Sequence, residues 1–569
     1  MELVDTRRLT GANLHDRRPG AVVEVRFAEG EDPESAIASW RAALERGLAR
    51  LGWRATIHAR RFGSGRGAEL MFTAEVDRLH AACDLSEWAV RGGDEAGLAA
   101  IVEAAAREQA ARGGCLPLIE RAELAGVAWL IDDDQFTLGH GALAQTWAIG
   151  ELPEPAALDW ASFGGWLPTA LITGTNGKTT SARLLARIVR KAGLHVGNTS
   201  TDGVYVDERV IDEGDWTGPG GARTLLRRPD VEFAVLEVAR GGMLRRGLGV
   251  ARADAALITN IDDDHLGEYG IETLADLALA KAIVASVVAS GGRIVLGAES
   301  APLVELAKTH AFPAPIVWFS PDPEHPVLVG HRAAGGEVCT VIEGVFCWCR
   351  GPLVEPLLAV LDAPLTIAGR ARHNVENVLG VVGLAHALDL PNQAIIAGLR
   401  EFGAAVEDNP GRARVWAVPV AGGEVDVLLD FAHNLAGLAR MAELVGGFDR
   451  SVLISIGMAG DRSDEQLRAI GAALLWFRPR FVVLREQQDY LRGRERGVVP
   501  RSIGEGLARA GHPREATRFV DDEPEALRLA LAEARPGELI VLLVHTDHEG
   551  VAAWLREVGA RPSSLLAPS

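Results

Sequence analysis

The residue with the clearest chemical potential is Lys178, in the run from Thr173 to Thr180 (Thr-Gly-Thr-Asn-Gly-Lys-Thr-Thr). Lysines and arginines together number 58, and only four of them are lysines. A lysine kept in so arginine-rich a chain favours chemistry that arginine cannot perform. Because the lysine ammonium is a compact charge that reaches the terminal phosphates of a nucleotide, the run is typical of a phosphate-binding loop.

The elements that would position this loop are a strand before it and a helix after it. The apolar run 167–172 predicts the strand, and apolar residues at helical spacing over 181–191 predict the helix. Such a loop offers backbone N–H groups and a helix N-terminus to an anion, and the hydroxyl of Thr179 stands where a Mg²⁺ ligand is expected. The loop departs from the general pattern because Ile172 takes the place of the first glycine. We expect a nucleoside triphosphate site, or descent from proteins that had one, and a chance Gly-Lys-Thr turn is the alternative.

Two further groups follow predicted buried strands. Glu237 ends a strand over 233–236, and His265 comes soon after a strand over 256–259. The carboxyl ends of parallel strands face the ligand crevice of an α/β sheet. With Thr179, these residues could supply oxygen and imidazole ligands for divalent cations beside the phosphates. A solvated strand end is the alternative for Glu237 taken alone.

Lys281, the third of the four lysines, lies in an apolar helical run over 277–288. A lysine on such a helix ordinarily extends its ammonium to solvent. The functional alternative is a buried lysine that reacts with CO₂ to form a carbamate. The carbamate would turn a cation into an anionic ligand for Mg²⁺.

The length of 569 residues exceeds what one hydrophobic core supports, so several domains are expected. Residues 1–125 predict a small α+β domain, with a strand over 21–27 and helices over 33–51 and 92–112. Residues 126–166, with three aspartates at 132–134 and a Pro-rich stretch at 152–156, predict a connector.

Residues 167–405 predict a parallel sheet covered by helices on both faces, because apolar strands alternate with helical stretches. Within them, 316–367 predicts an added antiparallel element. Residues 406–569 predict a Rossmann-like domain. Its predicted strands are 425–430, 452–456, 481–484 and 539–544, and its predicted helices are 436–445, 464–477, 503–510 and 523–534.

Composition is that of an ordinary soluble globular protein, and the net charge of -19 argues against nucleic-acid or anionic-membrane binding. No apolar stretch is long enough to span a bilayer, and the acidic N-terminus lacks the apolar core of a signal peptide. The five cysteines are scattered, apart from Cys347 and Cys349, for which we expect a packing role. The chain is therefore expected to be cytoplasmic with reduced thiols.

These motifs, in this order, resemble the Mur ligases, the family of the peptidoglycan amino-acid ligases and folylpolyglutamate synthetase. Within the family, residues 167–569 are similar to the Mur-like half of the cyanophycin synthetases, and residues 1–125 more faintly resemble their N-terminal domain. The large ATP-grasp domain of those enzymes is expected to be absent, because only residues 126–166 separate the two parts. The segments that carry the resemblance are 173–180, 201–205, 217–219, 237–245, 264–267, Lys281, 369–377, 410–412, 430–434 and 492–494.

The resemblance implies ATP and Mg²⁺ as cofactors and assigns site residues. Lys178, His265 and Lys281 would be catalytic, and the metals would be held by Thr179, Glu237, His265 and carbamylated Lys281. ATP would be bound by Gly174, Thr175, Asn176, Gly177, Lys178, Thr179, Thr180, Asn374, Asn377, Arg412, Asp430 and His433. Of these, Asn374 and Asn377 would contact adenine, and Arg412 and Asp430 would reach the phosphate and ribose. The family pattern is broken at Leu435, where a proline is usual.

The implied reaction is amide formation between a carboxylate and an amine through an acyl phosphate, with release of ADP and phosphate. The amine is expected to be an amino acid, for example a basic one such as arginine, and the acceptor a small acidic amino acid or peptide. Glu486 and Asp489 could pair with a cationic amine, or could belong to a solvated charged loop. A homo-oligomer is expected. A nucleotide hydrolase and a non-catalytic, ATP-binding partner of a cyanophycin-type synthetase remain the alternatives.

Overall fold

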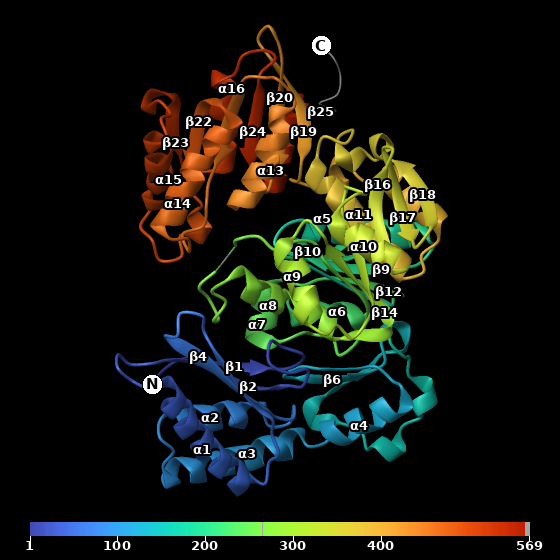
Figure 1. The fold of residues 1–569 in the computed structure, drawn as a ribbon, viewed down its shortest axis with the longest axis vertical. Coiled ribbons are helices and arrows are strands. Elements are labelled where there is room, and N and C mark those ends of the chain that lie inside the picture. The colour runs from blue at the N-terminus through green and yellow to red at the C-terminus, as the bar shows by residue number, and fades with distance from the viewer. Residues whose placement is uncertain (265, 564–569) are drawn as a thin grey trace. The chain divides into compact units, whose positions relative to one another are not determined.

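The computed structural model describes residues 1–264 and 266–563. The chain divides into two compact units, drawn in Figure 1. The first contains Met1–Leu357 and Glu376–Gly398, and the second contains Leu358–Val375 and Leu399–Ser569. Within the described ranges, no helix combines the length and the apolar character needed to cross a membrane.

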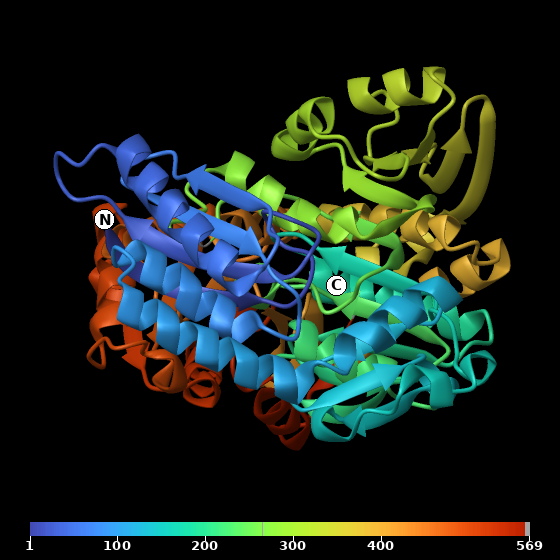
Figure 2. The ribbon, with the colours of Figure 1, turned by 90° about the horizontal axis from the view of Figure 1, so that it is seen from below.

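The first unit begins with a four-stranded antiparallel sheet in the order β1-β2-β4-β3. Three helices pack on one face of this sheet and bury apolar residues that alternate along the strands, such as Val23, Leu70 and Phe72 (Figures 1 and 2). The predicted helix over 33–51 is observed as α1. Asp32 caps its N-terminus, and Gly52, in the left-handed conformation, ends it. The elements are β1 (Glu2–Leu9), β2 (Gly20–Arg26), α1 (Pro33–Leu51), β3 (Ile57–Arg61), β4 (Gly67–Thr73), α2 (Leu79–Val90) and α3 (Glu95–Arg112).

Residues 126–166 contain more structure than a connector. After α4 (Cys115–Ala125), the strands β5 (Trp129–Ile131), β6 (Gln135–Leu138) and β7 (Gln145–Ala148) form an antiparallel sheet. Phe136, Leu138 and Phe163 pack with apolar residues of α4 in a small buried core. The sequence pattern did not predict this sheet because strands of three or four residues are too short to show a period.

The central sheet of the first unit has the order β11-β10-β9-β12-β8-β13-β14-β15-β16-β17-β18. The strands from β9 through β16 in that order are parallel, whereas β10, β11 and β17 run antiparallel to their neighbours. The strands are β8 (Thr169–Thr173), β9 (Val196–Ser200), β10 (Gly203–Val206), β11 (Arg209–Glu213), β12 (Phe233–Glu237), β13 (Ala253–Ile258), β14 (Val288–Gly297), β15 (Ile316–Phe319), β16 (Glu337–Ile342), β17 (Val345–Arg350) and β18 (Leu353–Ala359). The prediction of an antiparallel element over 316–367 is correct for β16 and β17 but wrong for β15, which extends the parallel sheet.

Helices cover both faces of this sheet, as the sequence predicts. On one face, residues such as Ala256 and Leu296 pack with α6 to α9, and on the other face Gly380 and Gly383 of α11 lie against Leu257 and Val317. The helices are α5 (Lys178–Lys191), α6 (Pro219–Leu226), α7 (Arg240–Arg246), α8 (Leu274–Ser286), α9 (Ala301–Thr309), α10 (Pro326–Ala333), α11 (Arg372–Ala387) and α12 (Asn392–Glu401). Gly383 also contacts Cys339, and the buried Cys347 and Cys349 lie in β17, in keeping with the packing role expected for the pair.

The sheet of the second unit has the order β23-β22-β21-β24-β20-β19-β25, parallel from β23 to β20 and antiparallel beyond it. Separate apolar cores lie on its two faces, so the unit is a doubly wound, Rossmann-like sheet. The strands are β19 (Arg414–Val420), β20 (Gly423–Asp430), β21 (Val452–Ile456), β22 (Pro479–Arg485), β23 (Thr517–Val520), β24 (Leu539–Leu543) and β25 (Arg561–Pro562). The helices are α13 (Leu435–Gly446), α14 (Asp464–Ala473), α15 (Val498–Arg509), α16 (Glu523–Glu533) and α17 (His548–Glu557).

Candidate active site

The predicted phosphate loop joins β8 to α5, and its two glycines are sterically required. Gly174 has φ 149° and Gly177 has φ 86°. A Cβ atom on Gly174 would lie 1.8 Å from Oγ1 of Thr259, and one on Gly177 would lie 2.1 Å from Oδ1 of Asn377. Ile172, which replaces the usual first glycine, is buried inside β8. The loop is thus an unobstructed backbone cradle that begins at Gly174 and ends at the N-terminus of α5.

Polar residues that follow β13 fix the conformation of this loop. The backbone N–H of Thr175 donates to the carbonyl of Asn260 at 2.9 Å, and that of Asn176 donates to Oδ1 of Asn260 at 2.9 Å. The hydroxyl of Thr259 donates to the carbonyl of Asn176 at 2.7 Å. Hydrogen bonds from a neighbouring strand end therefore preorganise the cradle before any ligand arrives. No role was predicted for Asn260 or Thr259, although both lie at the end of a predicted strand.

The structure brings Lys178 and Lys281 to the same backbone carbonyl. Nζ of Lys178 donates to the carbonyls of Gly174 (3.1 Å) and Thr175 (2.9 Å), and Nζ of Lys281 donates to the carbonyl of Gly174 at 2.9 Å. Lys281 is 5% exposed, so its side chain does not extend to solvent. Burial and the nearby charge of Lys178 hold the pKa of Lys281 well below its usual value. A lysine in this state is readily the neutral amine, which can attack the carbon of CO₂ to form a carbamate.

Oxygen ligands suited to Mg²⁺ lie beside the cradle. Glu237 ends β12, which pairs with β8 in the register Glu237↔Ile172, and its side chain is buried. Oγ1 of Thr179 lies in the first turn of α5, 3.4 Å from Oγ1 of Thr201. A carboxylate and a hydroxyl are hard donors of the kind that Mg²⁺ prefers, so the residues present fit this ion. His265 lies outside the described residues, and no group of three or more His, Cys, Asp or Glu side chains could hold a metal within 1–264 and 266–563.

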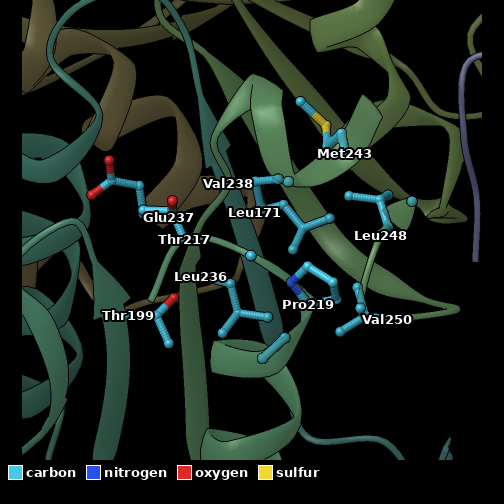
Figure 3. Close-up of a pocket in the computed structure, with 15 residues that line it drawn as sticks. Leu171, Thr199, Thr217, Pro219, Leu236, Glu237, Val238, Met243, Leu248 and Val250 are labelled. Carbon is cyan, nitrogen blue, oxygen red and sulfur yellow. The ribbon is translucent and has the colours of Figure 1, made fainter. Parts of the chain in front are cut away.

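A small cavity separates this end of β12 from the apolar core (Figure 3). Glu237, Thr199 and Thr217 line one end of it, and Leu236, Pro219 and Met243 are among the apolar residues of the opposite wall. In Figure 3 the carboxylate of Glu237 points away from that wall. The cavity volume of about 20 Å³ admits a single water, so it is not a substrate pocket.

The remaining nucleotide residues divide between the two units. Asn377 is in the first unit, against Gly177, whereas Asn374 is in the second, where its amide donates to the carbonyl of Leu365 at 3.0 Å. Thr180 follows Thr179 in the buried first turn of α5.

In the second unit, Arg412, Asp430 and His433 gather around Phe431 at the carboxyl end of β20. The guanidinium of Arg412 lies 4.8 Å above the ring of Phe431, and the ring of His433 meets that ring edge to face at 5.3 Å. The carboxylate of Asp430 accepts the backbone N–H groups of Ala413 and Ala432, both at 2.8 Å. Burial raises the pKa of Asp430 against these hydrogen bonds. No role was predicted for Phe431. Its position between the predicted site residues Asp430 and His433 is the sequence feature that could have indicated one.

The two acidic residues in the loop after β22 differ in their exposure to solvent. Glu486 is 4% exposed and accepts the backbone N–H of Gly497, whereas Asp489 is exposed. The side chain of Glu486 is therefore committed to its own loop, which favours a structural role for this carboxylate.

Comparison with known proteins assigns the class of these domains. Residues 172–385 match the Mur ligase middle domain, and residues 412–543 match the Mur ligase glutamate ligase domain. The chain, in these two regions, belongs to the Mur ligase family.

Among individual proteins, the cyanophycin synthetase of Crocosphaera subtropica is 35% identical over 378 residues, which are 66% of this chain and 42% of that protein. The UDP-N-acetylmuramoyl-L-alanyl-D-glutamate–2,6-diaminopimelate ligase of Listeria monocytogenes is 25% identical over 410 residues, covering 70% of this chain and 77% of the relative. A solved structure of a bifunctional folylpolyglutamate synthase/dihydrofolate synthase has a TM-score of 0.49 at 19% identity, covering 68% of this chain and 89% of that one. The chain spans less than half the length of the cyanophycin synthetases it matches.

Proposed function

We propose that the protein is an ATP-dependent carboxylate–amine ligase that forms an amide through an acyl phosphate and releases ADP and phosphate. The observation that carries this proposal is the meeting of Lys178 and Lys281 at the carbonyl of Gly174, at 3.1 and 2.9 Å. The two lysines are far apart in the sequence, and the fold places both at a preorganised phosphate cradle. Membership of the Mur ligase family supports the same reaction.

The first step joins two anions, so control of charge is the main physical task of the site. The backbone N–H groups of the cradle and the N-terminus of α5 would hold the phosphates of ATP, and Lys178 would contact the transferring γ-phosphate. A carboxylate oxygen of the acceptor then attacks the γ-phosphorus, and ADP leaves. Next, the amine attacks the acyl carbon, loses a proton, and phosphate leaves.

Mg²⁺, when bound, would screen the negative charges of the carboxylate and the phosphates. We propose Thr179, Glu237, His265 and Lys281 as its ligands, with Lys281 carrying CO₂ as a carbamate. The depressed pKa and the burial of Lys281 support this reading, because only a neutral amine reacts with CO₂.

Other residues are proposed as nucleotide contacts. Asn374 and Asn377 are the proposed adenine contacts, and Arg412, Asp430 and His433 are the proposed phosphate and ribose contacts of the second unit. The aromatic ring of Phe431, which lies under Arg412, supports a binding role for this group.

The substrates proposed are an amino acid, such as arginine, and a small acidic amino acid or peptide. The identity of 35% to a cyanophycin synthetase supports this choice. We further propose that the enzyme works in the cytoplasm, where ATP and reduced thiols are maintained, and that it forms a homo-oligomer.

The test is phosphate release from Mg·ATP with a panel of amines and acids, followed by mass spectrometry of each active mixture. Arginine, lysine, ornithine and diamines are paired with aspartate, glutamate and aspartyl peptides. A ligase forms ADP only when both partners are present, and its product is lighter by one water than their sum. ATP turnover without an acceptor would instead identify a hydrolase, and ATP binding without turnover would identify a non-catalytic partner.

A further inference from the structure

The sheet of the N-terminal domain buries a charged second face. Its helices cover the face that carries Leu70 and Phe72, and alternation places Glu69 of β4 on the opposite face. All seven residues of β4 are buried, and Glu69 is 1% exposed. A carboxylate in the middle of a strand that is buried on both faces requires partners, because an isolated buried charge is strongly unfavourable.

Two arginines and a histidine supply these partners. The carboxylate of Glu69 lies 2.6 Å from Nη2 of Arg7, 2.8 Å from Nη2 of Arg60 and 3.3 Å from Nε2 of His15. Although burial alone would raise the pKa of Glu69, the hydrogen bond with His15 and the charges of Arg7 and Arg60 lower it to about 2. Glu69 is thus a fixed anion that orients both arginines.

The two arginines extend from Glu69 to the central domain. Arg60 donates to the carbonyls of Tyr269 (3.3 Å) and Gly270 (3.0 Å) and pairs with Asp276 at 3.3 Å. Arg7 donates to the carbonyl of Leu244 at 2.8 Å and stacks over the ring of Tyr269 at 4.8 Å.

A neighbouring turn of the N-terminal domain adds two hydrogen bonds to the same segment. The backbone N–H and the hydroxyl of Ser64 both donate to the carboxylate of Glu272, at 2.6 and 2.8 Å. We call Arg7, Arg60, Ser64 and Glu69 the N-terminal clamp.

The segment that the clamp contacts has an unfavourable backbone. Tyr269 has φ 54°, a conformation that aromatic residues rarely adopt, and Gly270 follows it with φ 63°. A Cβ atom on Gly270 would lie 2.2 Å from the ring of Phe62, so only glycine permits this approach. Such a backbone persists only where the surroundings determine it, and here Arg7 and Arg60 do so.

The contacted segments lie next to the candidate active site along the chain. Leu244 is in α7, which begins three residues after Glu237, and residues 269–276 lead into α8, which carries Lys281. Asp276, which Arg60 contacts, also closes the capping box that starts α8. The helix that carries Lys281 thus begins with a carboxylate that Arg60 of the N-terminal domain also contacts.

Buried ion clusters contribute little net stability, since desolvation offsets their attraction. Their better-attested effect is to fix one geometry, which apolar contacts alone do less well. We propose that the N-terminal clamp sets the geometry of the ligation site, and that Arg60 is its principal positioning residue. This inference rests on the proposed ligase function. It assigns a role to a domain that precedes both regions matched to the Mur ligases.

The test compares the full-length Arg60→Met and Arg61→Met variants. Arg61 is the next residue of β3, and its guanidinium is 43% exposed and pairs with Glu34 instead. Arg60→Met is expected to lower kcat for amide formation at least tenfold, with the Kd of a non-hydrolysable Mg·ATP analogue within twofold of wild type. Arg60→Lys should recover part of kcat, because an ammonium keeps the charge but not the planar fork that contacts Glu69, Asp276 and the carbonyls of residues 269 and 270. Arg61→Met should match wild type in both quantities.

Hydrogen exchange measures the clamp independently of activity. Amides of residues 266–276 should exchange faster in Arg60→Met than in Arg61→Met, while those of α5 stay protected. Unchanged exchange in this segment, or a kcat within twofold of wild type, would overturn the inference. If Arg60→Met does not fold, Glu272→Gln takes its place, because it weakens the two bonds with Ser64. Faster exchange of residues 266–276 in Glu272→Gln would support the clamp, and unchanged exchange would overturn it. An inactive wild type would count against the proposed function alone, because the exchange comparison still stands.

Discussion

The carboxyl edges of the two parallel sheets both carry ionisable side chains, but these side chains meet different partners. At the edge of the central sheet, Lys178 and Lys281 donate to backbone carbonyls of the phosphate loop. At the edge of the sheet in the second unit, the fully buried Arg485 pairs with Glu523 at 2.7 Å. Glu523 also accepts the backbone N–H groups of His545 and Asp547, both at 2.7 Å.

The difference separates a pair of reactive lysines from a structural ion pair. The carbonyl dipoles do not neutralise the ammonium of Lys178, so the first edge keeps positive character for an incoming anion. The buried Lys281 lies beside it with a pKa well below its usual value. A guanidinium beside a carboxylate is neutralised locally, and that pair instead fixes the loop that precedes α17. Substitutions of the lysines at the first edge should therefore lower activity, and substitutions in the ion pair at the second edge should lower stability.

The largest effect is expected for Lys178→Met. Loss of the charge that contacts the γ-phosphate should lower ATP-dependent amide formation about 10³-fold, the magnitude typical of removing a preorganised electrostatic contact. The melting temperature should stay close to that of wild type, because the ammonium bonds to carbonyls of its own loop. Lys308→Met is the matched control, since Lys308 is 64% exposed and pairs with Glu305 on its own helix. Equal activity of the two variants would show that the first edge is not reactive.

The next effect is expected for Glu523→Gln in the second unit. Removing one partner of a buried ion pair leaves Arg485 uncompensated and should lower the free energy of unfolding by about 3 kcal/mol. Denaturant unfolding followed by circular dichroism measures this change. The exposed pair Arg561–Glu424 is the control, and Glu424→Gln should cost less than about 1 kcal/mol. A loss of activity in Glu523→Gln without any loss of stability would remove the distinction between the structural ion pair and the reactive lysines.

Sequence reasoning predicted the second unit well because its signals are local. The strands 452–456 and 539–544 are observed within one residue of their predicted ends, and the helix over 523–534 is observed as α16. These runs have the length and the apolar pattern that parallel sheets and their covering helices require. The phosphate loop was predicted for the same reason, since its glycines, lysine and flanking elements are contiguous.

What the sequence could not predict depends on tertiary contacts. The bond of Lys281 to Gly174 and that of Arg60 to Gly270 join residues that no local pattern relates. Nor can a four-residue strand such as β15 reveal its direction, because direction is set by the neighbour it pairs with. In the sequence, Arg485 and Glu523 are ordinary charged residues, one just after a predicted strand and one at the start of a predicted helix. Their buried pairing could therefore not be predicted.

Acidification should weaken the second edge through His545. Burial and the charge of Arg485 lower the pKa of His545 to about 3. Because the unfolded chain binds a proton near pH 6.5 and the folded chain does not until far lower pH, stability falls as pH decreases below about 6.5. Between pH 7 and pH 5 the loss attributable to this group should reach about 2 kcal/mol. Unfolding curves of wild type and His545→Gln at both pH values measure it, and equal pH dependence in the two proteins would contradict the prediction.

The smallest effect is expected for Leu435→Pro, which restores the residue usual in the family at this position. Leu435 is the first residue of α13, directly after Asn434, whose side chain accepts the backbone N–H of Gly437. Proline is favoured at the first position of a helix because its missing N–H has no partner there and its φ is already helical. We expect unfolding free energy to change by less than about 1 kcal/mol, in the stabilising direction, with amide formation unchanged. A marked loss of activity would mean that Leu435 itself contributes to the site.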